Sequence, residues 1–217
     1  MGILEPDDGG VTCIWGSSPD NIYFAGRGGT IAHYDGQRWQ RIESGTDLNF
    51  RDIWGVYDRM VNKYEILALA STVTVNIQES RIFKIRNDQV EELDNEGLSP
   101  EVSSLWFIPN KRYYIVGAGI HQKRNLHDIK WRVYSPGIVT RFLSAGVRGS
   151  NINNVIVVGS FGEIVHFNGI SWYNYYPQIS LSSGVFGEVS VKNNIIVAVG
   201  FNSKGFGSYA VILIGRK

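Results

Sequence analysis

Short apolar runs separated by polar turns repeat along this chain, and the stretch from Val11 to Trp39 shows the pattern most clearly. Two apolar runs, 11–15 and 22–25, flank a turn rich in Gly, Ser, Pro, Asp and Asn, and a third, alternating run leads to an Asp-Gly turn before Trp39. Apolar runs of this length between turn residues are typical of β-strands joined by tight turns. The stretch therefore predicts four short antiparallel strands.

A second copy of this stretch lies in the C-terminal half of the chain. Five positions of the first copy have counterparts 133 residues later without a gap, where Ile31, His33, Tyr34, Gly36 and Trp39 correspond to Ile164, His166, Phe167, Gly169 and Trp172. Agreement of this extent indicates an internal repeat.

Weaker copies occupy the rest of the chain. The positions taken as equivalent in successive copies are Trp15, Trp54, Trp106, Arg148 and Val189. The steps between them are 39, 52, 42 and 41 residues, so the period is about forty.

Repeats of this length, each with four short strands, indicate the blades of a β-propeller. No copy shows an apolar stripe at helical spacing, so we expect almost no helix. The prediction is an all-β, single-domain chain 1–217 with five four-stranded blades, at about 11–46, 50–94, 102–136, 142–178 and 184–217. An open solenoid is the alternative, and it would expose apolar faces at both ends.

The fifth copy contains only three predicted strands, so we expect residues 2–5 to supply the fourth. Ile3 precedes Trp15 by twelve positions, as Ile42 precedes Trp54. Pairing of 2–5 with the last apolar run of the fifth copy would close the propeller. The competing interpretation is an open arc or part of a larger propeller.

Composition excludes several classes of protein. Hydrophobic residues make up 43% and charged residues 19%, as in ordinary soluble globular domains. The net charge is +1 and no long run of like charge occurs, which argues against a nucleic-acid partner. Cys13 is the single cysteine, so no intramolecular disulfide can form. No apolar run is long enough to span a membrane, and the N-terminus lacks the features of a signal peptide.

The segment IWGSSPDNIYFAGRGGTIAHYDGQRW, residues 14–39, resembles the blade repeat of a group of bacterial β-propellers without an assigned activity. Some members are related to photosystem assembly factor-like propellers. The resemblance implies a propeller fold and an exported location, periplasmic or at the cell surface. The chain contains no sialidase-type Asp-box and no repeated Gly-His and Trp-Asp pair of the WD40 kind.

Positions that depart from the repeat are candidates for function. Arg148 stands where other copies have Trp, and Glu188 aligns with Ile, Leu and Val. Because a lone buried charge is costly, we expect these two residues to form a pair across neighbouring blades. They form either a structural ion pair or a polar binding site in the channel with Asp52 nearby.

A second candidate surface is the aromatic segment 172–177, of sequence WYNYYP. Tyr173, Tyr175 and Tyr176 place aromatic rings on both faces of a predicted outer strand. Exposed tyrosines suit recognition of a protein or a glycan. The alternative is that neighbouring blades cover both faces.

Histidine positions indicate structure rather than chemistry. His33 and His166 share one repeat position, which favours packing and hydrogen bonding within each blade over a shared metal. His121 and His127 have no Cys or carboxylate at zinc-ligand spacing, so no metal site is predicted. The recurring tryptophans are expected between blades as core residues. No cofactor is predicted.

The residues favour a non-catalytic propeller that binds a protein partner or forms a subunit of a larger assembly. The alternative is a glycan-active enzyme, or a lectin-like carbohydrate binder, that uses the channel mouth. An enzyme would need carboxylates to converge there, and the candidates are Asp52, Glu163 and Glu188.

Overall fold

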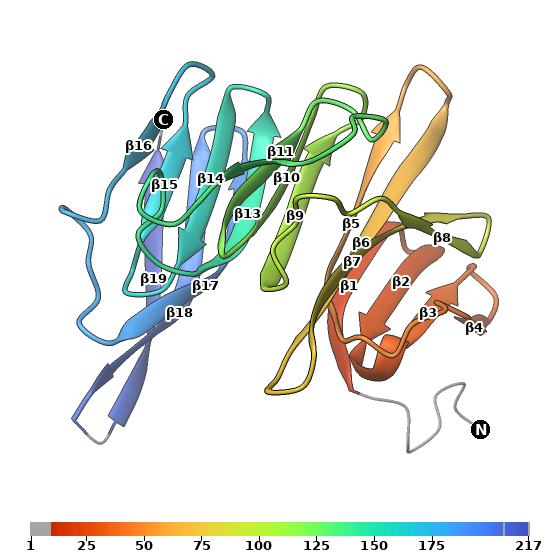
Figure 1. Cartoon of the computed structure of the whole chain (residues 1–217), viewed down its shortest axis with the longest axis horizontal. Coiled ribbons are helices and arrows are strands. Elements are labelled where there is room, and N and C mark those ends of the chain that lie inside the picture. Colours follow the sequence, from red (N-terminus) through yellow and green to blue (C-terminus); the bar gives the residue numbers. More distant parts are fainter. Residues whose placement is uncertain (1–9, 206, 217) are drawn as a thin grey trace. The chain divides into compact units, whose positions relative to one another are not determined.

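The computed structural model describes residues 10–205 and 207–216, and it contains five antiparallel sheets (Figure 1). Within this part of the chain the only helical turn is the three-residue 3-10 segment η1, Arg27–Gly29. The predicted all-β class is confirmed. The chain divides into two compact units, 1–102 and 103–217. We call each sheet a blade and number the blades along the chain.

The first unit holds two four-stranded blades, each with its strands in sequence order. Blade 1 consists of β1 (Val11–Ser18), β2 (Asn21–Gly26), β3 (Ile31–Tyr34) and β4 (Trp39–Ile42). Blade 2 consists of β5 (Phe50–Asp58), β6 (Lys63–Val73), β7 (Gln78–Arg86) and β8 (Gln89–Leu93). Their turns use residues that tolerate positive φ, such as Gly36 at 92° and the Asn87–Asp88 pair at 50° and 59°.

The two blades of the first unit pack through their first strands. The Trp15 ring is 8% exposed and lies directly over Gly55, where an added Cβ would come within 2.4 Å of the ring. Glycine at position 55 leaves room for this ring, because it has no side chain that would collide with it. The core also includes Phe50, Phe83 and Ile85.

The second unit holds three blades. Blade 3 consists of β9 (Val102–Ile108), β10 (Arg112–Gly117), β11 (Gly119–Lys123) and β12 (Arg132–Tyr134). Blade 4 consists of β13 (Ser144–Asn151), β14 (Asn154–Gly159), β15 (Ile164–Phe167) and β16 (Trp172–Asn174). Blade 5 consists of β17 (Gly184–Lys192), β18 (Ile195–Lys204) and β19 (Gly207–Arg216).

Blade packing in the second unit repeats the arrangement of the first. Trp106 lies over Gly149, where an added Cβ would come within 2.7 Å of the ring. Blades 4 and 5 share a core that includes Ile156, Phe186 and Ala198. The predicted placement of these two tryptophans between blades is therefore correct.

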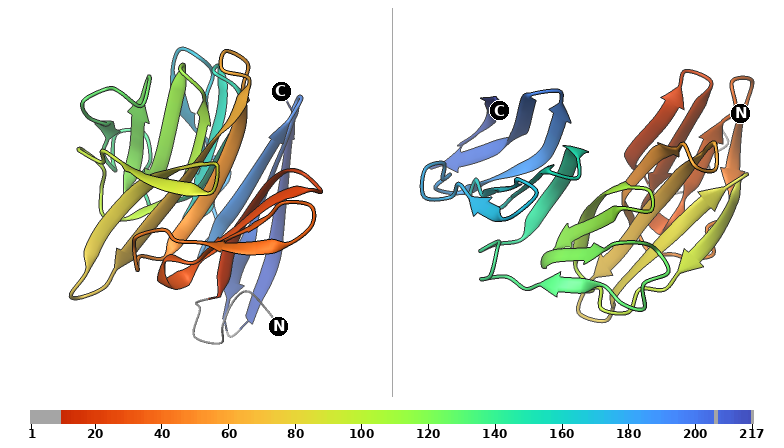
Figure 2. Two further views of the ribbon diagram at one scale, coloured as in Figure 1. Left: turned by 90° about the vertical axis from the view of Figure 1, so that its right-hand side faces the viewer. Right: turned by 90° about the horizontal axis from the view of Figure 1, so that it is seen from above.

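Four of the five predicted four-stranded blades are confirmed, and blade 5 has three strands among the described residues. Both views in Figure 2 show this sheet in blue, with β19 as its outer strand. The fourth strand predicted for it, at 2–5, lies outside the described residues.

The strand ladder corrects the sequence alignment of the fifth copy by one residue. Glu188 pairs with Val199 just after a bulge, as Asp52 pairs with Leu69 in blade 2. Ser190, rather than Val189, therefore takes the position of Trp54. Blades 1 and 4 have a second bulge near the end of the first strand that blade 5 lacks, so its first hairpin is one residue shorter.

Candidate functional site

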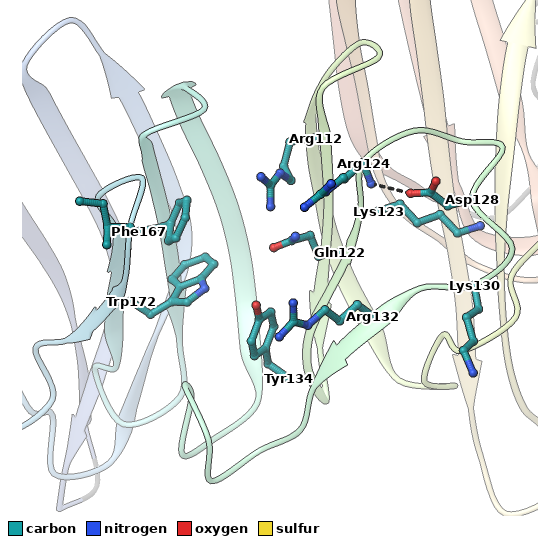
Figure 3. Close-up of a pocket in the computed structure, with 11 residues that line it drawn as sticks. Arg112, Gln122, Lys123, Arg124, Asp128, Lys130, Arg132, Tyr134, Phe167 and Trp172 are labelled. Atoms are coloured by element: carbon teal, nitrogen blue, oxygen red, sulfur yellow. Dashed lines mark hydrogen bonds between the residues drawn. The ribbon is translucent and has the colours of Figure 1, made fainter.

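The second unit contains a cleft of about 400 Å³ between the outer part of blade 3 and the β15–β16 turn of blade 4. Figure 3 shows three guanidinium groups and one amide that extend from blade 3 toward two aromatic rings of blade 4. These side chains belong to Arg112, Arg124, Arg132, Gln122, Phe167 and Trp172.

Strand alternation places the blade 3 groups on one face. Tyr114 pairs with Gln122, and Gln122 pairs with Arg132, so these three side chains lie side by side across the sheet. Arg112 lies on β10 two residues from Tyr114, and Arg124 lies just after the end of β11, two residues from Gln122. Both side chains extend on the same side. The short sequence patterns Arg-x-Tyr, Gln-x-Arg and Arg-x-Tyr therefore build a single polar and aromatic surface.

The lining of the cleft is strongly cationic. It carries five basic side chains, those of Arg112, Lys123, Arg124, Lys130 and Arg132, and one carboxylate, that of Asp128.

Asp128 is already engaged by its own loop. Its Oδ2 accepts hydrogen bonds from the amides of Arg124 (2.9 Å) and Asn125 (3.3 Å), and its Oδ1 accepts one from the Asn125 side chain (2.8 Å). These hydrogen bonds lower the pKa of the Asp128 carboxyl, and the bond from the backbone amide of Arg124 contributes most. The carboxylate holds the loop in place and also interacts electrostatically with Lys123, which is 3% exposed and lies over the Trp131 ring. The groups that face the aromatic wall are therefore the guanidinium groups of Arg112, Arg124 and Arg132.

Arg112 has unused hydrogen-bonding capacity. Its Nε is buried, and no hydrogen-bond partner for it exists among the described residues. An unmade hydrogen bond on a buried donor is costly, so an acceptor that reached the Arg112 Nε would relieve this cost. Burial raises the pKa of the neighbouring Tyr114 to about 12, and the positive charge of Arg112 opposes that rise.

Aromatic rings form the facing wall. Trp172 packs on Phe167 at 5.0 Å and edge-on to Tyr114 at 5.9 Å. On the blade 3 side, the Arg132 guanidinium lies 5.0 Å from the ring of Tyr134. At the rim, Ile170 at the tip of the β15–β16 turn is 93% exposed. The cleft thus combines fixed positive charge with flat apolar surfaces, an arrangement suited to a carboxylate-bearing segment with apolar neighbours.

The structure places the predicted pair, Arg148 and Glu188, on adjacent blades of the second unit. Arg148 is half-buried, and its Nη1 donates to Ser104 Oγ (3.0 Å), the Leu105 carbonyl (3.1 Å) and its own neighbour Val147 (2.8 Å). Glu188 is exposed on β17. The ion pair between these residues stays a prediction.

The two other candidate carboxylates, those of Asp52 and Glu163, each accept hydrogen bonds from nearby residues. Asp52 is 6% exposed in the first unit, and its Oδ1 accepts a hydrogen bond from the Ile53 amide (2.9 Å). Glu163 is 2% exposed in the second unit and accepts hydrogen bonds from the amides of Arg141 (2.8 Å) and Phe142 (3.2 Å) and from the Asn174 side chain (2.7 Å).

The three tyrosines of the aromatic segment differ in environment. Tyr173 is 51% exposed, whereas Tyr175 packs against the core of blades 4 and 5. Tyr176 packs on Phe142 at 5.2 Å, with the Arg141 guanidinium 5.3 Å from its ring. Recognition by this segment stays a prediction.

The histidines at the shared repeat position make the same contact in both units. His33 Nε2 lies 2.8 Å from Asn21 Oδ1, and His166 Nε2 lies 2.9 Å from Asn154 Oδ1. Each asparagine in turn donates to a serine on the first strand, Ser17 or Ser150. The hydrogen-bonding role inferred from the repeat is correct. No group of His, Cys, Asp and Glu that could hold a metal occurs within 10–205 and 207–216.

Sequence reasoning missed the cationic cleft. The signal was present, because residues 111–132 contain six Lys or Arg and a single acidic residue, Asp128. The near-zero net charge of the whole chain hides this local excess, and blade 3 is the copy that least resembles the others.

No family model and no curated protein matches this chain. In the part of the chain that the structure describes, no helix is long and apolar enough to cross a membrane.

Solved structures do match the fold. YCF48 bound to a D1 peptide superposes with a TM-score of 0.67 at 15% identity, covering 99% of this chain and 66% of that protein. The extracellular domain of BT3049 from B. thetaiotaomicron superposes with a TM-score of 0.60 at 11% identity, covering 97% of this chain and 29% of that one. This chain therefore spans about two thirds of the first match and less of the second. Together with the bladed sheets, these likenesses confirm the predicted β-propeller fold.

Proposed function

We propose that this propeller is a non-catalytic protein-binding module, which holds an acidic, extended segment of a partner protein in the cationic cleft. The observation that carries the proposal is the cleft lining, in which the guanidinium groups of Arg112, Arg124 and Arg132 face an aromatic wall, while the one carboxylate is held by its own loop. Guanidinium groups bind carboxylates through paired, charge-assisted hydrogen bonds.

The size and lining of the cleft support a peptide ligand. A cleft of about 400 Å³ accommodates a few side chains, and Trp172 together with the rim residue Ile170 offers apolar contacts beside the charges. A protein of the same fold, YCF48, has been solved with a D1 peptide bound, so the propeller scaffold is compatible with such a ligand. An exported location and membership of the bacterial repeat group remain predictions.

The glycan-active alternative has weaker support. Glu163, one of the three carboxylates that it would use, is 2% exposed and accepts three hydrogen bonds from its own blade and the preceding segment. That arrangement is typical of a structural carboxylate. The proposal therefore contains no catalytic step.

A matched pair of peptides tests the proposal. The probe is a fluorescein-labelled peptide of alternating Asp and Tyr residues, and the control peptide has Asn in place of each Asp. We expect the acidic peptide to bind more tightly by tenfold or more, and its binding to weaken as salt increases because the contact is electrostatic.

Two double variants locate the binding. Arg112→Gln combined with Arg132→Gln should weaken binding of the acidic peptide at least tenfold. Arg59→Gln combined with Lys63→Gln removes the same charge from exposed positions of the first unit and should leave binding nearly unchanged. Equal binding of the two peptides, or equal effects of the two variants, would contradict the proposal. So would tighter binding of a polyuronate oligosaccharide than of the acidic peptide.

A further inference from the structure

The outer edge of β19 is a long apolar strand edge. β19 pairs with β18 from Gly207 to Arg216, and no described strand lies on its other side. Three of its large apolar side chains are exposed by half or more: Tyr209 (51%), Ile212 (67%) and Ile214 (66%). Residues 208–215 contain no charge and no proline, the features that normally protect an exposed edge from pairing.

A cavity of about 170 Å³ adjoins this edge, between blades 4 and 5. Its apolar lining includes Ile156, Ile164, Tyr175, Ile196 and Leu213. Two polar residues, His166 and Arg216, also line it. The cavity therefore suits one aliphatic side chain close to a negatively charged group.

The first unit shows what occupies the corresponding place. Ile85 of β7 pairs with Ile66 and with Val90 of β8, and Val90 packs against the core of blades 1 and 2. In blade 5 the residue that pairs with Ile196, the counterpart of Ile66, is Gly215. The cavity thus lies where blade 2 has a larger side chain on its third strand and an aliphatic residue on a fourth strand.

In blade 2, the residue that precedes β8 also places a negative charge at this position. Asp88 Oδ1 lies 2.7 Å from Nδ1 of His33, and His33 is the counterpart of His166. The strand that fits this place in blade 2 therefore has the pattern acidic, any residue, aliphatic, as in Asp88-Gln89-Val90.

We propose that the outer edge of β19 binds an extended segment of a partner protein as the fourth strand of blade 5. An aliphatic side chain of this segment enters the cavity, and a carboxylate two residues before it lies beside Arg216 and His166. Main-chain hydrogen bonds along the edge supply affinity, and the cavity supplies specificity. None of the residues that line the cationic cleft lines this cavity, so the two sites are independent.

The probe for this site is a fluorescein-labelled peptide Asn-Asp-Gln-Val-Glu-Glu-Leu, which copies residues 87–93. We expect it to bind the intact chain, as measured by fluorescence anisotropy. A control peptide with Gly in place of Val and Asn in place of Asp should bind at least tenfold more weakly.

A cavity-filling variant tests the location. A Cβ at Gly215 would meet only the Ile196 side chain, at 3.7 Å, so Gly215→Val fits without strain and should weaken peptide binding at least tenfold. Gly187→Val, on β17 with nothing within 4 Å of an added Cβ, is the matched control and should leave binding unchanged. The Arg112→Gln, Arg132→Gln variant should also leave it unchanged, which separates this site from the cleft.

Hydrogen exchange reports on the edge itself. Without peptide, the β19 amides that point away from β18 should exchange quickly, and the peptide should slow them tenfold or more. Failure of the peptide to bind, or equal binding to Gly215→Val, would overturn the proposal. Slow exchange without peptide would overturn it as well, since the edge would already be covered. In that case, a doubled molar mass would show that a second copy of the chain covers the edge. Faster exchange after deletion of residues 1–6 would show that the segment 2–5 covers it.

Discussion

The junction between blades 1 and 2 and the junction between blades 4 and 5 are built from the same repeat, yet they differ in what fills them. In the first, Trp15 lies over Gly55 and Tyr23 stacks on His33 at 4.0 Å. In blade 4, Ile156 takes the strand position of Tyr23 and belongs to the core of the second junction, whereas Arg148 takes the strand position of Trp15 but donates hydrogen bonds to blade 3.

The outer parts of the two junctions differ further. The β7–β8 hairpin brings Asp88 to His33 and Val90 to the core of the first unit. In the second unit, Gly215 and a cavity of about 170 Å³ take the corresponding place. Blades 1 and 4 therefore share the same His-Asn hydrogen bond, whereas the packing against the next blade differs, with side chains filling the first junction and a cavity in the second.

Replacement of the tryptophan at the first junction should have the largest effect. Trp15→Ala removes a ring that is 8% exposed and leaves a space above Gly55, so we expect a loss of about 3–5 kcal/mol in the free energy of unfolding. Arg148→Ala, at the equivalent strand position of blade 4, should cost less because Arg148 is only half-buried. Urea unfolding measures both, and equal losses would contradict the comparison.

Alkaline pH should weaken the first junction. Burial, with a further contribution from Asp88, raises the pKa of Tyr23 to about 12. The folded chain therefore keeps the phenol proton while the unfolded chain, with a pKa near 10, loses it, so stability falls as pH rises from about 10 to 12. A shift of this size corresponds to about 2–3 kcal/mol.

Tyr23→Phe is the matched variant, and it should remove this part of the pH dependence. Ile156 occupies the equivalent position in blade 4, so the second junction has no counterpart. Tyr114, whose pKa burial also raises to about 12, should account for a similar part in blade 3. Urea denaturation at pH 9 and pH 11.5 measures the change in the free energy of unfolding for the wild type and the variant. An equal change in Tyr23→Phe would show that Tyr23 is not the titrating group.

Removal of the shared asparagine tests the conserved part of the comparison. Asn154→Ala deletes the amide that joins Ser150 to His166, and because Asn154 is 2% exposed we expect a cost of about 1–3 kcal/mol. Asn21→Ala should cost less, since Asn21 is half-buried. Thermal unfolding checks the order, and a larger effect at Asn21 would contradict it.

The smallest effect is expected for Asp88→Asn. Asn tolerates the positive φ of 59° at this position, so the change isolates the charge beside His33. The carboxylate is 37% exposed, and we therefore expect a cost below about 1 kcal/mol by urea unfolding. A larger loss would show that this contact, rather than the packing of Val90, holds the hairpin in place.

Much of the fold could be predicted because the repeat is local. Strand lengths and turns follow from residues within one copy, and the roles of His33 and His166 follow from their shared position. The register of the fifth copy differs by one residue from the sequence prediction, because Val189 is apolar like the tryptophans of the other copies and because β17 lacks the second bulge found in blades 1 and 4. Arg148 and Glu188 were singled out as exceptions to the repeat, whereas the cleft is built from residues that a single copy does not reveal.

By itself, the sequence determined the class of fold and the blade repeat, since period-two alternation and turn residues act over a few positions along the chain. The tertiary structure alone decided where the cationic cleft lies, because it brings three strands of blade 3 opposite Trp172 of blade 4. The tertiary structure also decided which junction has a cavity. Val90 packs on the core of blades 1 and 2, whereas Gly215 lines the cavity between blades 4 and 5.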